Sequence, residues 1–131
     1  MASLNIKKLK SGTDVRGVAS PILGRAVTLT VGAVETIARA FVAWLKKKTG
    51  KQRVKIALGN DSRITADELV EAFERGALKS GATLSYTGLS STPSMFMILQ
   101  SKARNLDGSV MITASHLPAD RNGLKFFTPE G

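Results

Sequence analysis

The chain has 131 residues, of which 43% are hydrophobic and 22% charged, with no cysteine and a formal net charge of +9 at pH 7. This composition is typical of one folded domain and excludes a disordered chain, a disulfide-stapled module and any thiol chemistry. No window holds the roughly 18 uninterrupted apolar residues of a membrane span and the first residues lack a signal-peptide core, so we expect one cytoplasmic domain over residues 1–131.

The first predicted elements are a polar loop and a long helix. Residues 11–17 read Ser-Gly-Thr-Asp-Val-Arg-Gly, where two glycines bracket a polar stretch, which predicts a sharply turning loop near a sheet edge. Between residues 30 and 49 apolar side chains recur at helical spacing, lysines gather at the end and Gly50 follows. This pattern predicts a helix with a basic carboxyl terminus.

A strand, a second helix and another strand follow. Residues 53–59 alternate and carry branched side chains, as a half-buried strand does, and the polar loop 60–63 comes next. Thr65 and Glu68 have the spacing of a capping box, which predicts a helix that begins there and is closed by Gly81. Residues 82–86 predict a short strand.

The last part of the chain predicts a helix and two strands. Ser91 is an expected N-cap, with Pro93 in the first turn of a helix that runs to about residue 103. Residues 109–113 form the most strand-like apolar run. The pair Asn122-Gly123 favours a tight turn with positive φ, after which residues 124–128 predict a final strand.

Strands and helices alternate from residue 53 onward, which predicts an α/β fold with a mostly parallel sheet and right-handed crossovers. In such sheets ligands bind beyond the carboxyl ends of the strands. The loops at 61–63, 90–92 and 115–125 all follow predicted strands. We therefore expect these three loops to gather at one edge of the sheet.

Cations and hydroxyls in these loops predict an anion pocket. Ser115 lies between a buried strand and a proline-containing loop, which suits a phosphoryl acceptor but equally a serine that caps the strand. Arg16 and Arg63 suit phosphate because a guanidinium is a planar, permanently charged fork of donors. Either arginine can instead be tied structurally, Arg63 for example to Asp61.

Two further side chains are candidates for this pocket. His116, the only histidine, can titrate near neutral pH, orient a phosphate or bond to a carbonyl. A Ser-His-acid hydrolase is disfavoured, because consecutive residues on a strand-like segment point apart. Lys125 follows the predicted turn, which can fold it back towards Ser115 as a phosphate ligand or general base, although a solvated edge-strand lysine fits as well. We see no metal-ligand cluster in the sequence.

Together these segments resemble the α-D-phosphohexomutases, a family that includes phosphoglucomutases and phosphomannomutases. Residues 113–118, Thr-Ala-Ser-His-Leu-Pro, and residues 122–125, Asn-Gly-Leu-Lys, resemble the phosphoserine loop Thr-Ala-Ser-His-Asn-Pro with its downstream Asn-Gly-x-Lys. Residues 12–17 are similar to the signature Gly-Thr-Asp-x-x-Arg-Gly, residues 59–63 to Gly-x-Asp-x-Arg, and residues 92–93 to the helix-opening Thr-Pro. The resemblance implies the family's N-terminal domain I, a three-layer α/β/α domain with a mixed, mostly parallel sheet.

The resemblance also implies roles for individual residues. Ser115 would carry the transferable phosphoryl group, Arg16 and Lys125 would assist proton and phosphoryl transfer, and His116 would line the same site. The reaction would be a 1,6-phosphoryl shift on a hexose phosphate through a bisphosphate intermediate. The expected phosphate and substrate ligands are Thr13, Arg16, Arg63, Asn122 and Lys125.

The resemblance implies Mg²⁺, bound through the phosphate on Ser115 and through an Asp-x-Asp-x-Asp loop of a second domain that this sequence does not contain. It also implies a hexose 1,6-bisphosphate activator, a hexose phosphate substrate and the remaining mutase domains as partners.

We expect the chain alone to be inactive or incomplete, and to self-associate through its exposed domain interface. The alternatives are a non-catalytic module that binds sugar phosphates or a protein and, more weakly, a nucleic-acid binder. The lysine runs have few aromatic neighbours, so we expect neither nucleic acid nor membrane as a partner.

Overall fold

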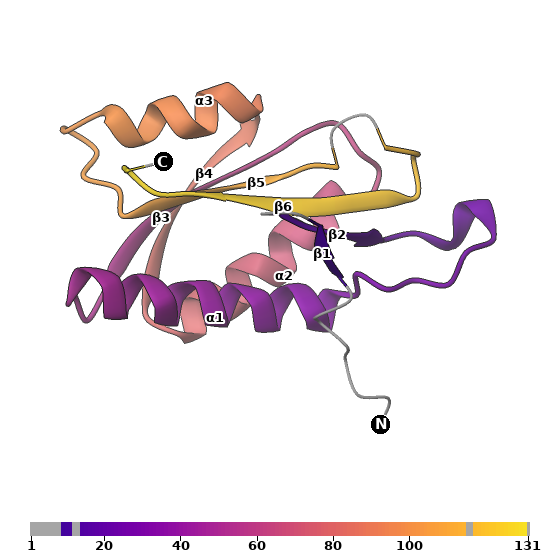
Figure 1. The fold of residues 1–131 in the computed structure, drawn as a ribbon, viewed down its shortest axis with the longest axis horizontal. Coiled ribbons are helices and arrows are strands. Elements are labelled where there is room, and N and C mark those ends of the chain that lie inside the picture. Colours follow the sequence, from indigo (N-terminus) through magenta and orange to yellow (C-terminus); the bar gives the residue numbers. More distant parts are fainter. Residues whose placement is uncertain (1–8, 12–13, 115–116, 131) are drawn as a thin grey trace.

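The computed structural model describes residues 9–11, 14–114 and 117–130, and Figure 1 shows its fold. The strands are Lys10–Ser11 (β1), Asp14–Val18 (β2), Val54–Asn60 (β3), Ala82–Leu89 (β4), Gly108–Ile112 (β5) and Arg121–Phe127 (β6). The helices are Val31–Thr49 (α1), Ala66–Lys79 (α2) and Thr92–Met97 (α3), with 3₁₀ turns at Pro21–Leu23 (η2) and Ile98–Gln100 (η3). Within the described residues, no helix is both long and apolar enough to cross a membrane.

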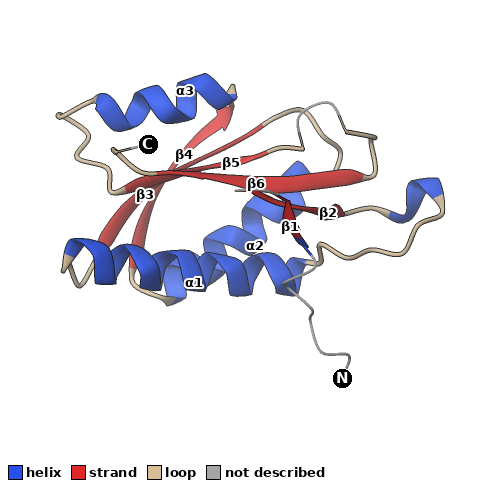
Figure 2. Cartoon of the chain, viewed as in Figure 1, coloured by secondary structure: helices blue, strands red, loops and turns tan. Residues whose placement is uncertain are grey.

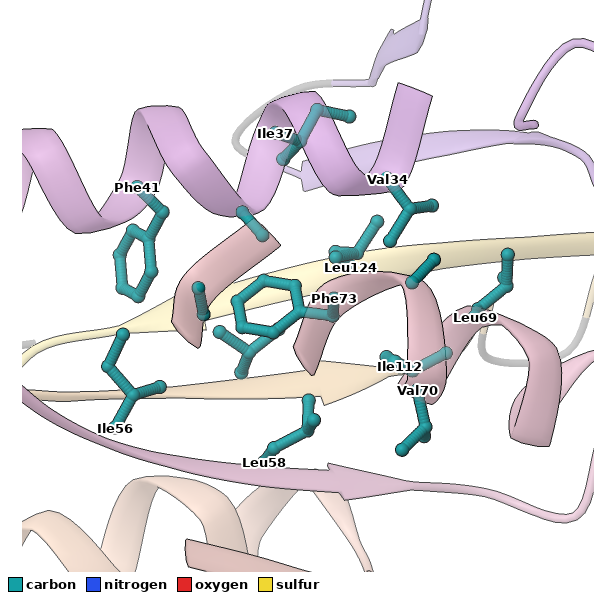
Figure 3. Packing of buried hydrophobic residues seen from close by; sticks show 14 of the residues in the cluster. Val34, Ile37, Phe41, Ile56, Leu58, Leu69, Val70, Phe73, Ile112 and Leu124 are labelled. Carbon is teal, nitrogen blue, oxygen red and sulfur yellow. The ribbon is translucent and has the colours of Figure 1, made fainter. Parts of the chain in front are cut away.

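The elements form three layers. Figure 2 shows α1 and α2 on one face of the sheet and α3 on the other. The larger core lies under α1 and α2, where Phe73 is fully buried among side chains of both helices and the central strands (Figure 3). A smaller cluster that includes Met95 and Met111 lies under α3. The predicted three-layer α/β/α class is confirmed.

The sheet is mixed, with the strand order β1-β2-β6-β5-β3-β4. Strand β3 is parallel to both β4 and β5, whereas β6 is antiparallel to β5 and to β2. A helix separates β3 from β4 and another separates β4 from β5, but β5 and β6 are joined by one loop, so the chain returns in the opposite direction. Among the described strands, parallel pairing is confined to β3, β4 and β5, whose carboxyl ends share one edge. Two of the five pairings are parallel and three are antiparallel, so the sheet is mixed as expected but not mostly parallel.

The long helix α1 begins and ends where the sequence predicts. The hydroxyl of Thr30 accepts a hydrogen bond from the Ala33 amide at 3.0 Å and so caps the amino terminus. At the other end Gly50 has φ 72° and its amide donates to the Lys46 carbonyl. Helix α2 packs closely against α1, since a Cβ on Gly76 would lie 2.3 Å from the Glu35 carbonyl oxygen.

The predicted turn at Asn122-Gly123 is wrong. Both residues lie inside β6, where Asn122 pairs with Gly17 and Gly123 pairs with Arg16. Gly123 is not among the glycines with positive φ; instead, a Cβ there would lie 2.3 Å from the Val15 carbonyl oxygen. A glycine is needed because β2 and β6 approach closely, not because the chain turns. Of the predicted loop at 11–17, residues 14–17 belong to β2. The expected reversal of the chain near the sheet edge is confirmed, because β1 and β2 pair antiparallel with Ser11 opposite Asp14.

Two helix predictions also need correction. The side chain of Thr65 makes no capping hydrogen bond to α2, although Thr65 and Glu68 have the spacing of a capping box. A capping box does exist at α3, between Ser91 and Ser94. That helix ends at Met97 and continues only as the 3₁₀ turn η3, so it is shorter than the predicted helix to residue 103.

Candidate functional site

The loops that follow β3, β4 and β5 meet at one edge of the sheet, as predicted. The Asp61 amide donates to the Ile112 carbonyl at 3.2 Å, and the Ser90 amide donates to the Asn60 carbonyl at 2.8 Å. The Thr113 amide donates to the carbonyl of Gly123 at 2.9 Å, which joins the start of the β5–β6 loop to β6. This edge holds most of the sequence-predicted site residues that the structure describes.

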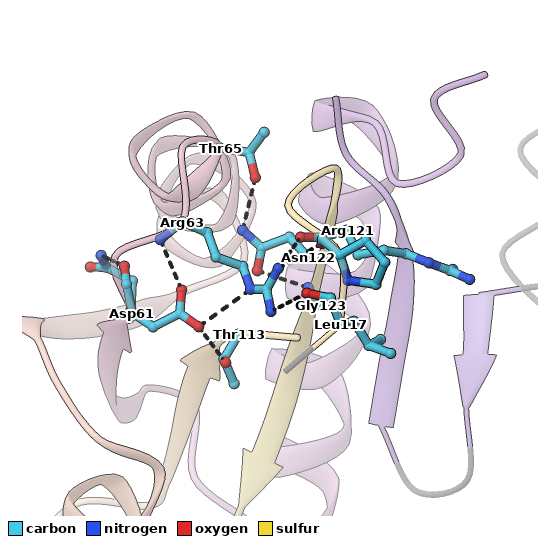
Figure 4. Close-up of polar contacts among 10 residues, drawn as sticks. Asp61, Arg63, Thr65, Thr113, Leu117, Arg121, Asn122 and Gly123 are labelled. Carbon is cyan, nitrogen blue, oxygen red and sulfur yellow. Dashed lines mark hydrogen bonds and ion pairs between the residues drawn. The ribbon is translucent and has the colours of Figure 1, made fainter. Parts of the chain in front are cut away.

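Arg63 faces the loop between β5 and β6 (Figure 4). Its Nη1 donates to the carbonyls of Pro118 at 2.8 Å and Arg121 at 3.1 Å, and its Nη2 donates to the Leu117 carbonyl at 2.9 Å. Its Nε lies 3.5 Å from a carboxylate oxygen of Asp61, and only 11% of its side chain is exposed. The structural role considered for Arg63, including its pairing with Asp61, is confirmed.

Asp61 connects both sides of this loop. One carboxylate oxygen accepts the Arg63 amide at 3.2 Å and the other accepts the Thr113 hydroxyl. Beyond Thr113, the Leu117 amide donates to the Ala114 carbonyl at 3.1 Å. The segments on either side of residues 115–116 are thus fixed by hydrogen bonds. The predicted site residues Ser115, His116 and Thr13 themselves lie outside the described residues.

A second cluster joins β2 to β6. Lys125 Nζ lies 2.6 Å from Asp14 Oδ2, and Arg16 Nη2 lies 3.4 Å from the same oxygen. Two cations therefore share one carboxylate, which leaves a net positive charge. Arg16 Nε is buried and has no hydrogen-bond partner among the described residues. A buried donor of this kind favours an anionic acceptor.

The cluster lies next to the β5–β6 loop. A Cβ on Gly123 would be 3.0 Å from both Arg16 Cγ and the Thr113 carbonyl oxygen, so only a glycine separates the arginine stem from the loop. Lys125 reaches the site from within β6, where it pairs with Met111, and not by way of a turn. The structure brings Arg16 and Lys125 together as the anion-pocket hypothesis requires.

Asn122 makes its side-chain hydrogen bonds inside the protein. It is fully buried, its amide nitrogen donates to the Thr65 hydroxyl at 2.9 Å, and its amide oxygen accepts the Gly123 amide at 2.9 Å. Both ends of the side chain are used inside the protein. Asn122 therefore connects β6 to the start of α2, and its role as a phosphate or substrate ligand stays a prediction.

The sequence analysis did not identify the pair Arg25 and Asp120. Arg25 donates to both carboxylate oxygens of Asp120, from Nε at 2.7 Å and from Nη2, and the Asp120 side chain is completely buried. Hydrogen bonding from Arg25 holds the pKa of Asp120 below its usual range. The Asp120 carbonyl also accepts the amides of Ala19 and Ser20. The partners are 95 residues apart and belong to no shared motif, so no local pattern reveals them.

The described residues contain no group of three or more histidine, aspartate or glutamate side chains placed to hold a metal ion. The two carboxylates at the site already have partners: Asp14 contacts Lys125 and Arg16, and Asp61 contacts Arg63 and Thr113. These carboxylates do not form a metal site by themselves.

Comparison with known protein families gives a consistent result. Residues 8–131 match the family described as "Phosphoglucomutase/phosphomannomutase, alpha/beta/alpha domain I". The chain is 35% identical over 121 residues to a phosphoglucosamine mutase of Alkaliphilus oremlandii and 38% identical over 121 residues to that of Bacillus subtilis. Each alignment covers 92% of this chain and 25% of the relative. The chain therefore spans about a quarter of the length of these curated relatives.

A solved structure is similar over nearly the whole chain. It is the crystal structure of a phosphoglucomutase/phosphomannomutase family protein from Burkholderia thailandensis, with a TM-score of 0.76 and 28% sequence identity. The alignment covers 98% of this chain and 27% of the solved one. The fold and the sequence thus point to the same relatives.

Proposed function

Because the chain belongs to the phosphoglucomutase/phosphomannomutase family, as its α/β/α domain I, we propose that it carries the transferable phosphoryl group of a hexose-phosphate mutase. The observation that carries the proposal is the cluster of Arg16 and Lys125 around Asp14, beside the loop that contains Ser115. Two cations that share one carboxylate provide the positive charge that a phosphoryl group requires.

In the proposed reaction the phosphoryl group leaves Ser115 Oγ for a hydroxyl of a hexose monophosphate, whose proton passes to a base of the site. The opposite phosphate of the resulting hexose 1,6-bisphosphate then returns to Ser115. Arg16 and Lys125 stabilise the charge of the transferring group and assist proton transfer, and His116 and Thr13 complete the site. The phosphoglucosamine mutases among the relatives support a hexosamine phosphate as the substrate to test first.

The family resemblance also supports Mg²⁺, which would neutralise charge on the phosphoserine when bound. The carboxylates of the described site are paired with cations or a hydroxyl, so this chain would offer the metal only the phosphate on Ser115. The other ligands and the sugar-recognition residues would belong to further mutase domains, in line with the quarter of the relatives' length that aligns. Full turnover would then require those domains, and self-association of this chain stays a prediction.

The direct test is incubation with glucose 1,6-bisphosphate or glucosamine 1,6-bisphosphate and Mg²⁺, followed by intact-mass measurement and peptide mapping, with Ser115→Ala as the matched control. The proposal expects one added phosphate that maps to Ser115 and is absent from the control. Unlabelled protein whose circular dichroism shows an intact fold would favour the alternative, a module that binds sugar phosphates or a protein without phosphoryl transfer.

A further inference from the structure

The geometry points to Arg63 as a positioning residue for the loop that carries Ser115, with Asp61 as the group that orients it. This inference rests on the proposed function, since the loop matters for chemistry only if Ser115 carries phosphate. It differs from the ligand role expected from the sequence, because Arg63 acts on backbone carbonyls of the protein and not on the substrate.

The Arg63 guanidinium points towards backbone carbonyls of the protein. Its Nη atoms donate hydrogen bonds of 2.8–3.1 Å to the carbonyls of Leu117, Pro118 and Arg121, and its Nε faces Asp61. Nearly nine-tenths of the side chain is buried. A phosphate could reach these donors only by displacing the backbone carbonyls that they now serve, which would lose these hydrogen bonds.

Asp61 and Arg63 contact the chain on both sides of residues 115–116. The Asp61 carboxylate accepts the hydroxyl of Thr113, at the end of β5, and the backbone amide of Arg63. The Arg63 guanidinium holds the chain on the far side of residues 115–116. The rigid loop after β3 therefore spans the Ser115 segment from both sides. A planar fork of donors can serve several carbonyls at once, which a single ammonium cannot do.

Arg16 and Arg63 differ in the partners of their guanidinium groups. Arg16 Nη2 lies 3.4 Å from Asp14 Oδ2, the same oxygen that Lys125 Nζ contacts. Arg63 Nη1 and Nη2 donate instead to the carbonyls of Leu117, Pro118 and Arg121. The two arginines of the sequence motifs therefore have different roles in this proposal. Arg16 contacts the phosphoryl group, and Arg63 positions the loop.

The test compares Arg63→Lys and Arg63→Ala with Arg75→Lys, a control on α2 whose half-exposed guanidinium forms an ion pair with Glu35. Two quantities are measured: the rate of Ser115 labelling against bisphosphate concentration, and amide hydrogen exchange at Leu117 and Arg121. We expect both Arg63 variants to lower the maximal labelling rate on the order of 10–100-fold, with the half-saturating concentration unchanged within about twofold. Exchange at both amides should accelerate on the order of tenfold, while β3 and the control stay unchanged.

The variant Arg63→Lys separates the positioning role from phosphate binding, because it keeps the positive charge but loses the planar fork of donors. A ligand arginine would give a raised half-saturating concentration with normal loop exchange, and lysine would partly rescue it; that pattern overturns the proposal. Hydrogen exchange needs no reaction, so it keeps the test sharp even if the alanine variant does not fold or the wild-type chain is not labelled. In the latter case the proposed function fails for this chain, and unchanged exchange in Arg63→Lys would overturn the positioning role separately.

Discussion

Arg25 and Asp120 form a two-pronged ion pair in which the carboxylate is completely buried and the guanidinium is nearly half exposed. The pair joins the segment after β2 to the loop between β5 and β6. A buried carboxylate that loses its cation keeps its desolvation cost without compensation. The loop of the candidate site therefore depends on a residue from a distant part of the chain.

We predict that Arg25→Ala destabilises the protein clearly, with a lower midpoint of urea unfolding, because Asp120 is left as an unpaired buried charge. Lys48→Ala serves as the control, since Lys48 pairs with the well-exposed Glu130 and such surface pairs contribute little. Equal unfolding midpoints for Arg25→Ala and Lys48→Ala would show that the buried Arg25–Asp120 pair contributes no more to stability than the surface Lys48–Glu130 pair.

The same pair predicts a pH dependence. The hydrogen bonds from Arg25 lower the pKa of Asp120 in the folded protein below its ordinary value, so the folded state favours the ionised form. The stabilisation is therefore present above the unfolded pKa and is lost as pH falls through the lowered folded pKa. The difference in unfolding free energy between wild type and Asp120→Asn should be largest at neutral pH and shrink below about pH 4. A difference that stays constant from pH 7 to pH 3 would contradict the ion pair.

A third prediction concerns Gly123. Alanine there would place a Cβ 2.3 Å from the Val15 carbonyl and 3.0 Å from Arg16 Cγ, so β2 must move away and take Arg16 with it. We expect a loss of stability at or above the upper end of the about 1–3 kcal/mol typical of overpacking, and slower Ser115 labelling. Gly88→Ala is the control: its Cβ would meet no atom within 4 Å, so only its φ of +73° costs, about 1–2 kcal/mol. Urea unfolding of both variants decides the ranking.

Local signals predicted the fold well where the neighbours in sequence are also the partners in space. Gly50 and Ser91 cap their helices as expected because each hydrogen bond closes within one turn. Thr65 and Asn122 have equally strong local signals, but each is the other's long-range partner, and that contact replaces both the capping box and the turn. Competition between a local and a distant hydrogen bond is not visible in the order of residues.

The same distinction applies to the candidate site. The motifs predicted that Arg16, Arg63 and Lys125 gather at the sheet edge. The structure joins Arg16 and Lys125 through Asp14, and it places Arg63 against the β5–β6 loop. The motifs did not separate an arginine that faces an anion from one that holds the loop, because both roles need the same guanidinium. That difference depends on burial and on which acceptors lie within reach, which only the folded chain determines.

The last prediction addresses Lys125 itself. If Lys125 stabilises the transferring phosphoryl group and moves a proton, Lys125→Gln should slow Ser115 labelling on the order of 10²–10⁴-fold, since general acid–base assistance contributes about that much.

Asp14→Asn tests the geometry independently: it removes the carboxylate that both Lys125 and Arg16 contact, so both cations lose their common anchor while the positive charge of the site rises. We expect this variant to bind the bisphosphate at least as tightly as wild type but to be labelled more slowly, because charge is retained and orientation is lost. Isothermal titration and time-resolved intact mass measure the two quantities separately. If Asp14→Asn instead lost binding and kept its labelling rate at saturation, Asp14 would be contributing to affinity and not to the placement of Lys125.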